Sequence, residues 1–416
     1  MFRRFDINVL ADTVREIDGW RVRMDSRRPL TRRWAGRLRR DLEAEAIAAS
    51  TRMEGVAVTV DDVRRILAGD SPRDVSPGDV ALVRGYHDAM TFVLRRADDR
   101  NFEWNRELIV GVHDRVLAGR YEDGAGRLRT GPSHVVELRT GQTLFEPPPA
   151  EDVPVLVDQL CAESAASDLH PALQAAWFHV AFAAIHPFAD GNGRTARVLS
   201  SLIMYRGGFR TRTFTSLEEW WGRHPQDYYA AFECLGQRFD SSADVTPFLA
   251  AHVDAQLRQI RALDLRERTI RGVFIVLENL LMDRALPERL TSALWDAFFG
   301  FTVTASSYRG ATDVSAATAT ADLRGATAAG LLRAVGQTRG RRYVAAPGLF
   351  SAIAVELGVD GLPAEAEAAR SRVIGELGSR LLESVAPPGQ PSLFDAAGLE
   401  KLPAEPDNAA RTRSPT

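Results

Sequence analysis

The stretch His186-Pro-Phe-Ala-Asp-Gly-Asn-Gly-Arg-Thr-Ala-Arg197 decides how the centre of this chain folds. It follows residues 172–185, which are apolar on all sides and therefore predict a buried central helix. That helix is expected to end at His186, because the residue before a proline is driven out of the helical region. Gly191 and Gly193 then allow a tight turn, and a second helix is expected over about 193–205.

The loop between these two helices carries the groups that phosphate chemistry needs. A helix N-terminus offers unpaired N–H groups and the positive end of the helix dipole to an anion. Arg194 and Arg197 are three residues apart and share one face of the first turn. Asp190 is an oxygen ligand suited to Mg²⁺, and His186 lies at the rim. Singly, each feature is an ordinary helix end, turn or loop; together they indicate phosphoryl or nucleotidyl transfer.

Residues 186–197 match every specified position of the Fic signature, HPFxDGNGRxxR, so the chain resembles the Fic family. The resemblance implies a mainly α fold, in which a Fic helical core carries a β-hairpin flap. It implies that His186 is the general base, that Phe188 anchors the loop and that Asp190 holds Mg²⁺, with Mn²⁺ as an alternative. The resemblance assigns the phosphates of ATP to Gly191, Asn192, Gly193, Arg194 and Arg197.

The activity that the resemblance implies is protein adenylylation (AMPylation), with ATP as the substrate. AMP would pass to a hydroxyl side chain of a target protein, or to the chain itself when no target is present. Some relatives carry a lysine at the position of Gly193 and transfer phosphate instead. Because this chain keeps the glycine, AMP transfer is favoured.

Residues 126–137 resemble the flap that places a target segment beside the base. Gly126-Arg-Leu-Arg-Thr-Gly-Pro132 stands where the family has its FR(T/S) motif, with Leu128 in place of the usual phenylalanine. The family's flap pairs edge-on with the target, which is a β-augmentation mode. An ordinary hairpin that ends at the prolines of 147–149 explains the same local pattern. The expected target-binding positions are Ser133, His134, Val135 and Val136.

Asp227-Tyr-Tyr229 resembles the region in which the family contacts adenine and ribose. The rings of Tyr228 and Tyr229 are equally typical of helix packing, and both interpretations stay open at the level of sequence. His179, in the middle of the first central helix, is interpreted as a packed and hydrogen-bonded core residue.

An inhibitory motif is indicated upstream of the core. Ser50-Thr-Arg-Met-Glu-Gly55 matches the family pattern (S/T)xxxE(G/N), in the N-terminal position that one subclass uses. The motif begins at Ser50 and contains Glu54. The Glu54 carboxylate is expected to accept two charge-assisted hydrogen bonds from Arg197, in the place that the γ-phosphate of ATP would take. Alone, a Glu-Gly pair ends many helices. The complete signature downstream is what favours the inhibitory interpretation.

The C-terminal part resembles a winged helix. Residues 314–326 have the place of the recognition helix, and 331–335 and 341–345 have the places of the two wing strands. Seven arginines against four acidic residues over 286–346 suit contact with a nucleic-acid backbone. Protein docking or packing of a homodimer is nevertheless favoured over DNA binding at this stage.

The chain has 416 residues, and we divide it into five parts. They are an N-terminal helical region with the inhibitory motif (1–75), a catalytic core (76–240), connecting helices (241–286), a winged-helix-like domain (287–350), and a helix followed by a disordered tail (351–416).

The composition excludes several classes of protein. A net charge of −3 argues against binding of polyanions by bulk electrostatics. The two cysteines, Cys161 and Cys234, are too few for a disulfide framework or a cysteine zinc site. Charged residues interrupt every apolar run of the N-terminal segment, and the most apolar stretch, 172–185, is too short to span a bilayer, so a cytoplasmic chain without a membrane segment is expected.

Two rival functions are kept at this stage. One is removal of AMP from a modified protein, with Glu54 positioning a water and His186 acting as an acid. The other is a DNA-binding regulator in which the pocket only senses a nucleotide. The presence of both His186 and Asp190 argues against a pure sensor.

Overall fold

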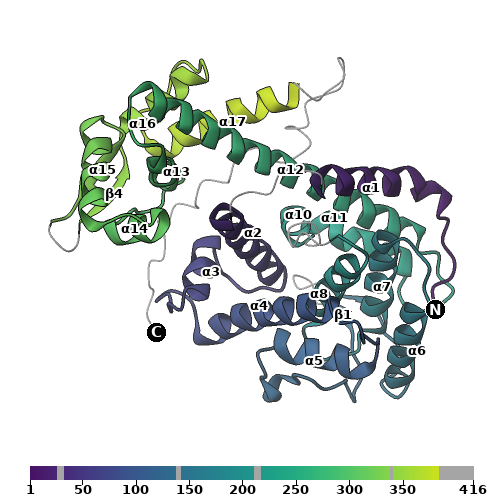
Figure 1. Cartoon of the computed structure of the whole chain (residues 1–416). Helices are drawn as coiled ribbons and strands as arrows, with labels where there is room; N and C mark the ends of the chain where they lie inside the picture. Colours follow the sequence, from purple (N-terminus) through teal and green to yellow (C-terminus); the bar gives the residue numbers. More distant parts are fainter. Residues whose placement is uncertain (26–31, 137–141, 210–216, 338–340, 384–416) are drawn as a thin grey trace, which may run out of the picture. The chain divides into compact units, whose positions relative to one another are not determined.

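The computed structural model describes residues 1–25, 32–136, 142–209, 217–337 and 341–383, and it is mainly helical, as predicted (Figure 1). The chain divides into two compact units, Met1–Arg261 and Ala262–Thr416, which we describe one at a time. The boundary falls inside the long helix α12 (Thr246–Asp283). The finer five-part division stays a prediction. No helix among the described residues is long and apolar enough to cross a membrane.

Unit 1 is built around two helices, α7 (Pro171–Ile185) and α8 (Asn192–Arg206), which pack along each other. Proline is favourable at the first position of α7, where no helical hydrogen bond is lost. The ring of His170 caps the same end by accepting a hydrogen bond from the Ala172 N–H at 3.2 Å. Almost every side chain of α7 is buried, so the predicted central apolar helix is confirmed.

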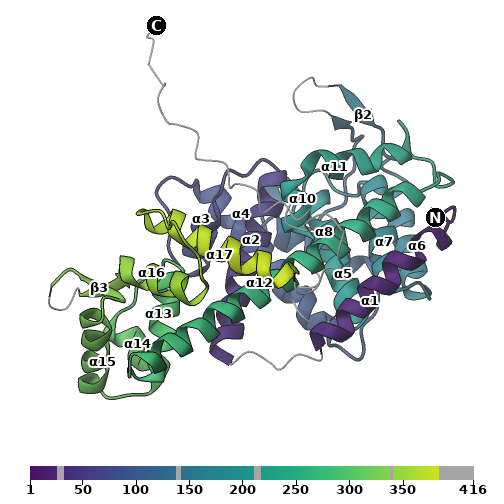
Figure 2. The ribbon, with the colours of Figure 1, turned by 90° about the horizontal axis from the view of Figure 1, so that it is seen from above.

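The other helices of unit 1 surround this pair (Figures 1 and 2). α4 and α5 pack against α8, α6 packs against α7, and α2 packs against α3, α4 and α10. Their bounds are α1 (Ala11–Asp25), α2 (Arg32–Met53), α3 (Val60–Leu67), α4 (Pro77–Ala97), α5 (Arg106–Val116), α6 (Val153–Ala165), α10 (Glu218–Arg223) and α11 (Pro225–Ala230), with 3₁₀ turns at Asn8–Leu10, Tyr121–Asp123 and Ala231–Leu235.

The segment after α8 is more broken than the sequence indicated. One helix was expected near 226–235, whereas the structure has α10, α11 and a 3₁₀ turn between 218 and 235. His224 leaves the helical region with φ −125° and ψ 55°, and Pro225 starts the next helix at its first position. The residue before a proline disfavours helical geometry, which explains the break.

The predicted flap hairpin is present as β1 (Val135–Val136) and β2 (Thr143–Phe145). The two strands are antiparallel, with Val135 opposite Phe145 and Val136 opposite Thr143. Phe145 is buried, and it fixes the base of the hairpin to the core of unit 1. Glu137, the last residue of the expected flap, lies outside the described part of the chain.

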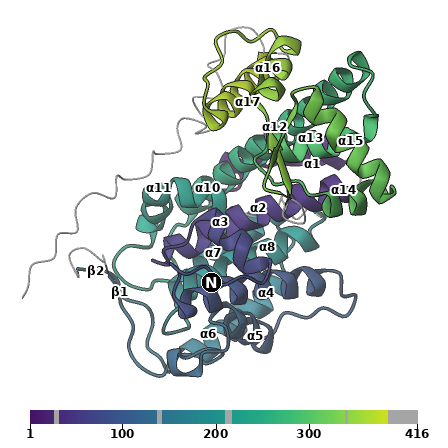
Figure 3. The ribbon, with the colours of Figure 1, turned by 90° about the vertical axis from the view of Figure 1, so that its left-hand side faces the viewer.

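Unit 2 contains helices followed by a two-stranded sheet and two more helices (Figure 3). The sequence indicated two helices before the strands over 288–346, and the structure has three, because Asp313 ends α14 in the left-handed region and Ser315 caps α15. Three helices and a hairpin are the order that a winged helix requires, and assignment to that fold stays a prediction. The expected disordered tail lies outside the described residues. The bounds are α13 (Thr291–Phe298), α14 (Ala305–Thr312), α15 (Ala316–Ala328), β3 (Leu332–Val335), β4 (Arg342–Ala345), α16 (Pro347–Glu356) and α17 (Ala366–Glu383).

The close packing of α4 on α5 makes Gly85 sensitive to substitution. A Cβ atom on Gly85 would lie 2.2 Å from the carbonyl oxygen of Arg115, and a backbone atom cannot move aside as a flexible side chain can. We expect Gly85→Ala to destabilise unit 1 by about 1–3 kcal/mol. The measurement is the urea midpoint of unfolding, followed by circular dichroism.

Gly111, in α5, provides the matched control. Its Cβ would meet only the guanidinium of Arg115, at 3.6 Å. Alanine also favours a helix over glycine, so Gly111→Ala should be neutral or stabilising by up to about 1 kcal/mol. Equal urea midpoints for the two variants would contradict the packing argument.

Candidate active site

The loop between α7 and α8 turns through two residues with positive φ. His186 ends α7 with φ 50° and ψ 60°, and Gly191 begins α8 with φ 75°. A histidine in the left-handed region is strained, so its surroundings must hold it there. Gly191 supplies no side-chain cap. The first N–H groups of α8 are therefore left for another acceptor, such as an anion.

The contacts of the His186 ring fix its tautomer. Nδ1 lies 3.3 Å from the carbonyl oxygen of Ala183, which can only accept a hydrogen bond, so Nδ1 carries the proton. Burial lowers the pKa of the imidazole; the contact with Ala183 opposes this shift, and the charge of Arg129 adds to it. At neutral pH His186 is thus uncharged with Nε2 unprotonated, which is the form that accepts a proton.

Arg129 holds the strained residue in place. Its Nε donates to the carbonyl oxygen of His186 at 2.8 Å, and its backbone N–H donates to the carbonyl oxygen of Pro187 at 2.9 Å. The same guanidinium donates to the carbonyl oxygens of Pro148, at 2.5 Å, and Gly131, at 3.1 Å. Arg129 therefore ties the base of the flap to the end of α7. Arg129 belongs to the predicted flap motif, but no pattern in the sequence indicated this role.

Asn192 closes the loop on itself. Its side chain accepts from the Phe188 N–H at 3.0 Å and donates to the Phe188 carbonyl oxygen at 2.9 Å. Phe188 is fully buried, in the anchoring position that the resemblance implied. The side chain of Asn192 bonds to the loop backbone in this structure, and its binding of phosphate stays a prediction. What Asn192 offers an anion is its backbone N–H at the start of α8.

His113, in α5, packs against the loop and hydrogen-bonds to it. The sequence did not predict this role. The ring Nδ1 accepts from the Gly126 N–H at 3.1 Å, so Nε2 carries the proton and donates to the carbonyl oxygen of Asp190 at 2.9 Å. The ring stacks on Phe188 with 3.6 Å between centroids. Burial lowers the pKa of His113 to about 4. No pattern in the sequence marked this histidine, because its partners are distant along the chain.

Asp190 and Arg194 form the polar side of the loop. Arg194 Nη2 donates to Asp190 Oδ2 at 3.0 Å, and the Asp190 side chain is 59% exposed. Arg194 itself is 3% exposed, and its Nε and Nη1 have no hydrogen-bond partner within the described part of the chain. Buried guanidinium groups without partners are costly, so these donors favour an anionic ligand.

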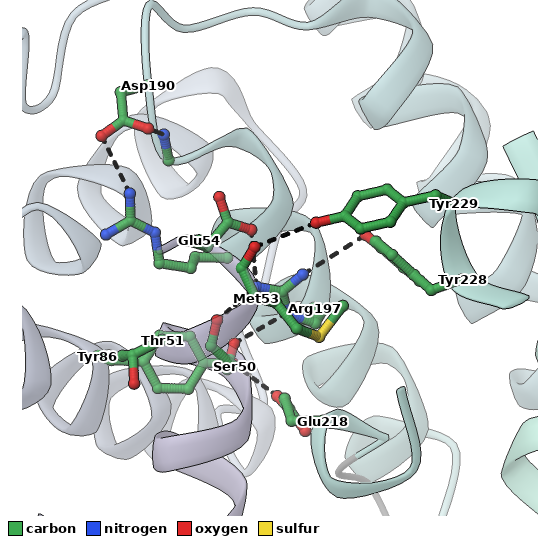
Figure 4. Close-up of polar contacts among 12 residues, drawn as sticks. Ser50, Thr51, Met53, Glu54, Tyr86, Asp190, Arg197, Glu218, Tyr228 and Tyr229 are labelled. Atoms are coloured by element: carbon green, nitrogen blue, oxygen red, sulfur yellow. Dashed lines mark hydrogen bonds and ion pairs between the residues drawn. The ribbon is translucent and has the colours of Figure 1, made fainter. Parts of the chain in front are cut away.

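Arg197, one turn further along α8, is buried and binds residues from α2 and α11 (Figure 4). Its Nε donates to Ser50 Oγ at 2.9 Å, and its Nη2 donates to the Ser50 carbonyl oxygen at 3.1 Å. Nη2 also donates to Glu54 Oε1 at 2.9 Å, and Nη1 lies 3.5 Å from the Tyr228 hydroxyl. Burial lowers the pKa of Arg197, but the carboxylate of Glu54 outweighs it, so the group stays charged.

Glu54 lies directly over the first turn of α8. A Cβ atom on Gly193 would be 2.4 Å from Glu54 Oε1, so the carboxylate fills the space beside this glycine. One hydrogen bond joins Glu54 to Arg197, where the sequence led us to expect a fork of two. The carboxylate occupies space beside the N–H groups and arginines that suit an anion.

A comparison with known families identifies this part of the chain. Residues 103–204 match the Fic/DOC family. The chain carries a Fic domain.

Two curated relatives are similar to parts of this chain. The protein adenylyltransferase Fic of Nematostella vectensis is 30% identical over 207 residues, which cover 48% of this chain and 44% of the relative. The protein adenylyltransferase fic-1 of Caenorhabditis elegans is 39% identical over 101 residues, or 24% of this chain and 19% of the relative. The chain thus spans less than half the length of these relatives.

Solved structures agree on the fold. A Fic family protein from Desulfovibrio desulfuricans G20 is similar with a TM-score of 0.53 and 23% identity, and the match covers 82% of this chain and 95% of that one. A Fic-domain-containing signalling protein from Bacteroides thetaiotaomicron has a TM-score of 0.50 and 20% identity, over 60% of this chain and 94% of that one. At these identities the similarity concerns the fold alone.

The two tyrosines after the Fic core lie in different environments. Tyr228 is buried, and its hydroxyl contacts His179 Nε2 at 3.1 Å behind Arg197. Tyr228 thus supports Arg197 from the core, and a contact of this tyrosine with adenine stays a prediction. Tyr229 is 55% exposed, and it donates to the carbonyl oxygen of Met53 at 3.1 Å, next to Glu54. His179 is buried and hydrogen-bonded, as predicted.

Four residues of the flap are expected to bind a target. Ser133 and His134 lie just before β1, and Val135 and Val136 form it. Val136, which ends β1, is 42% exposed, and Leu144 of β2 is 49% exposed. His134 is also exposed, whereas Ser133 and Val135 are partly covered. Contact of these residues with a target protein stays a prediction.

The neutral state of His113 makes the Fic loop sensitive to acid. Its pKa is about 4 in the folded chain against 6.5 for an unperturbed histidine, so the unfolded chain takes up the proton first as the pH falls. The contribution of His113 to the free energy of unfolding is complete above pH 6.5. It is lost between pH 6.5 and 4, by up to about 3 kcal/mol.

The His113→Asn variant tests this prediction, because asparagine keeps an acceptor near Nδ1 without titrating. We expect the urea midpoint of the parent to fall more steeply between pH 7 and 5 than that of His113→Asn. Other buried histidines shift both proteins in the same direction, so the difference isolates His113. Parallel pH profiles would exclude this role.

Proposed function

We propose that this chain is a protein adenylyltransferase, which transfers AMP from ATP to a hydroxyl side chain of a protein. The observation that carries the proposal is the pairing of an unprotonated His186 Nε2 with an uncapped helix N-terminus and the unpartnered guanidinium donors of Arg194. The names of the two curated relatives, both protein adenylyltransferases, support the same activity.

In the proposed reaction the target hydroxyl oxygen attacks the α-phosphorus of ATP. Its proton passes to His186 Nε2, while the proton on Nδ1 stays directed at the carbonyl oxygen of Ala183. A new P–O bond forms to the target, the bond from the α-phosphorus to the bridging oxygen breaks, and pyrophosphate leaves. The strained geometry that Arg129 imposes on His186 supports a fixed approach of the base to the hydroxyl.

The residues of the loop fit a nucleotide with a divalent cation. Mg²⁺ binds through one or two carboxylates and substrate phosphates, and no group of three or more acidic, histidine or cysteine side chains among the described residues forms a protein-only metal cage. Asp190, with its exposed carboxylate, would hold the ion, which would neutralise phosphate charge. Arg194 and the N–H groups of Asn192 and Gly193 would bind the phosphate oxygens, and Arg197 would bind the terminal phosphate once Glu54 leaves it.

We also infer that Glu54 inhibits the transfer. Its carboxylate lies beside Gly193 and holds Arg197, so it takes up both the space and the cation that a terminal phosphate needs. ATP could then bind only with its phosphates displaced. A misplacement of about 1 Å lowers a rate on the order of 10²-fold.

The His186→Ala variant tests the proposed base. We expect incorporation of labelled AMP into protein, measured on a lysate or as self-modification, to fall by roughly 10²–10⁴-fold with little change in ATP affinity. Chelation of divalent cations should abolish the reaction. His87→Ala, a partly exposed histidine of α4, is the control and should transfer AMP at the parent rate. A His186→Ala variant that is equally active would rule out the proposed role.

The Glu54→Gly variant tests the inhibition. Removal of the carboxylate frees Arg197 and the space over Gly193, so AMP incorporation should rise on the order of 10²-fold. Glu54→Asp, one methylene shorter, should release the activity in part. The readout is labelled AMP on protein at matched ATP concentration.

Arg197→Ala completes the set of variants. This substitution removes both the partner of Glu54 and the group that would bind the terminal phosphate, so it should not raise the rate of AMP transfer. Glu54→Gly combined with Arg197→Ala should behave as Arg197→Ala alone, since the two residues act through one contact. Equal rates for the parent and Glu54→Gly would reduce the motif to an ordinary helix end.

A further inference from the structure

Three buried side chains, beginning with the Arg197 partner Ser50, are joined by hydrogen bonds (Figure 4). The Tyr86 hydroxyl, from α4, donates to Glu218 Oε1 in α10 at 2.6 Å. The side chains of Ser50 and Tyr86 are also hydrogen-bonded to each other. Ser50, Tyr86 and Glu218 are each at most 1% exposed. Polar groups of α2, α4 and α10 thus meet beside Arg197, and the proposed binding of ATP gives no role to Tyr86 or Glu218.

The chemistry of the two end groups fixes the direction of every hydrogen bond in this row. A guanidinium can only donate, and an ionised carboxylate can only accept. Arg197 Nε donates to Ser50 Oγ at 2.9 Å. Burial and, second, the charge of Glu218 raise the pKa of Tyr86 well above its usual value, so the phenol keeps its proton and donates it to Glu218. The Ser50 hydroxyl is therefore the donor to the Tyr86 oxygen, and the row runs from Arg197 to Glu218.

This direction matters for Ser50. The proton of a serine hydroxyl rotates to suit its surroundings. Here the proton is held by Tyr86, so a lone pair of Ser50 Oγ stays directed at Arg197. The backbone of Ser50 contacts the same guanidinium, because its carbonyl oxygen accepts from Arg197 Nη2 at 3.1 Å. Glu54 follows four residues later, so the position of Ser50 determines where the Glu54 carboxylate reaches Arg197.

We propose that Tyr86 and Glu218 are positioning residues, which hold Ser50 and thereby the end of α2 against Arg197. Simple packing between helices would be served equally well by apolar side chains of the same size. Buried hydroxyl and carboxylate groups are costly unless each finds a partner, and here the partners lie in a fixed order. The consequence for AMP transfer rests on the proposed inhibition by Glu54, whereas the hold on α2 does not.

Hydrogen–deuterium exchange of the whole chain tests the hold on α2. Tyr86→Phe keeps the ring but removes the hydroxyl, so Ser50 loses its acceptor and Glu218 its donor. We expect the amides of residues 47–56 to exchange roughly 2- to 10-fold faster than in the parent, as the loss of one or two hydrogen bonds implies. Exchange in α6, in the same unit, should stay at the parent rate.

Tyr308→Phe is the matched control. Tyr308 lies in unit 2, is buried, and donates to the buried carboxylate of Asp322 at 3.0 Å, as Tyr86 does to Glu218. Loss of its hydroxyl should leave exchange of residues 47–56 unchanged.

Two more substitutions separate the row of hydrogen bonds from packing. Ser50→Ala combined with Tyr86→Phe should accelerate exchange of residues 47–56 no more than Ser50→Ala alone, because both act through one contact. Glu218→Gln keeps an oxygen that accepts from Tyr86 and should retain most of the protection, whereas Glu218→Leu should match Tyr86→Phe. Unchanged exchange of residues 47–56 in both Tyr86→Phe and Ser50→Ala, or equal acceleration throughout unit 1, would overturn the proposal.

Incorporation of labelled AMP is the second readout. Tyr86→Phe weakens the hold on the segment that carries Glu54, so it should raise incorporation by a smaller factor than Glu54→Gly does. Added to Glu54→Gly, it should change nothing further. A rate below that of the parent would overturn the link to inhibition. If no variant transfers AMP, Glu54→Gly included, the proposed function is wrong, and the exchange of residues 47–56 still decides whether Tyr86 and Glu218 position α2.

Discussion

The buried charge of Arg197 is the constraint on which the active site depends. A guanidinium taken out of water must be matched by acceptors, and here they come from Ser50 and Glu54 at the end of α2. Removing one partner of a buried ion pair typically costs 3–5 kcal/mol, because the other charge is left without compensation. The same arginine therefore anchors the end of α2 to α8. If a nucleotide binds at Arg197 as proposed, it must replace one anion with another, so that the buried cation keeps a partner.

In the loop between α7 and α8, a second arginine holds a strained residue in place. His186 adopts a left-handed conformation that its own backbone disfavours, and Arg129 and Pro187 keep it there. The strain is local, but the contacts that maintain it come from the flap and from the turn after it. His186, the proposed base, and the flap, which would receive a target, are thereby parts of one hydrogen-bonded unit.

Much of this arrangement could be predicted from the sequence, because it is local. The end of α7 at His186, the glycine turn and the start of α8 follow from the conformational limits of proline and glycine. The supporting residues could not be predicted in the same way. His113 reaches Asp190 across 77 positions of chain, and the burial of Tyr228 follows from how α11 packs. In unit 2 the third helix was missed, since the break at Asp313 depends on a left-handed residue that no glycine marks.

The space beside Gly193, which the Glu54 carboxylate fills, has a consequence for how this chain can change over generations. The Glu54 carboxylate lies where any side chain at position 193 would begin, so the two positions share one volume. A larger residue at 193 would displace Glu54, and the chain would then gain nothing from keeping a carboxylate just after α2. We therefore expect the two positions to be inherited as a pair. Lineages that lose the glycine should soon lose the glutamate as well, although 139 residues separate the two in the chain.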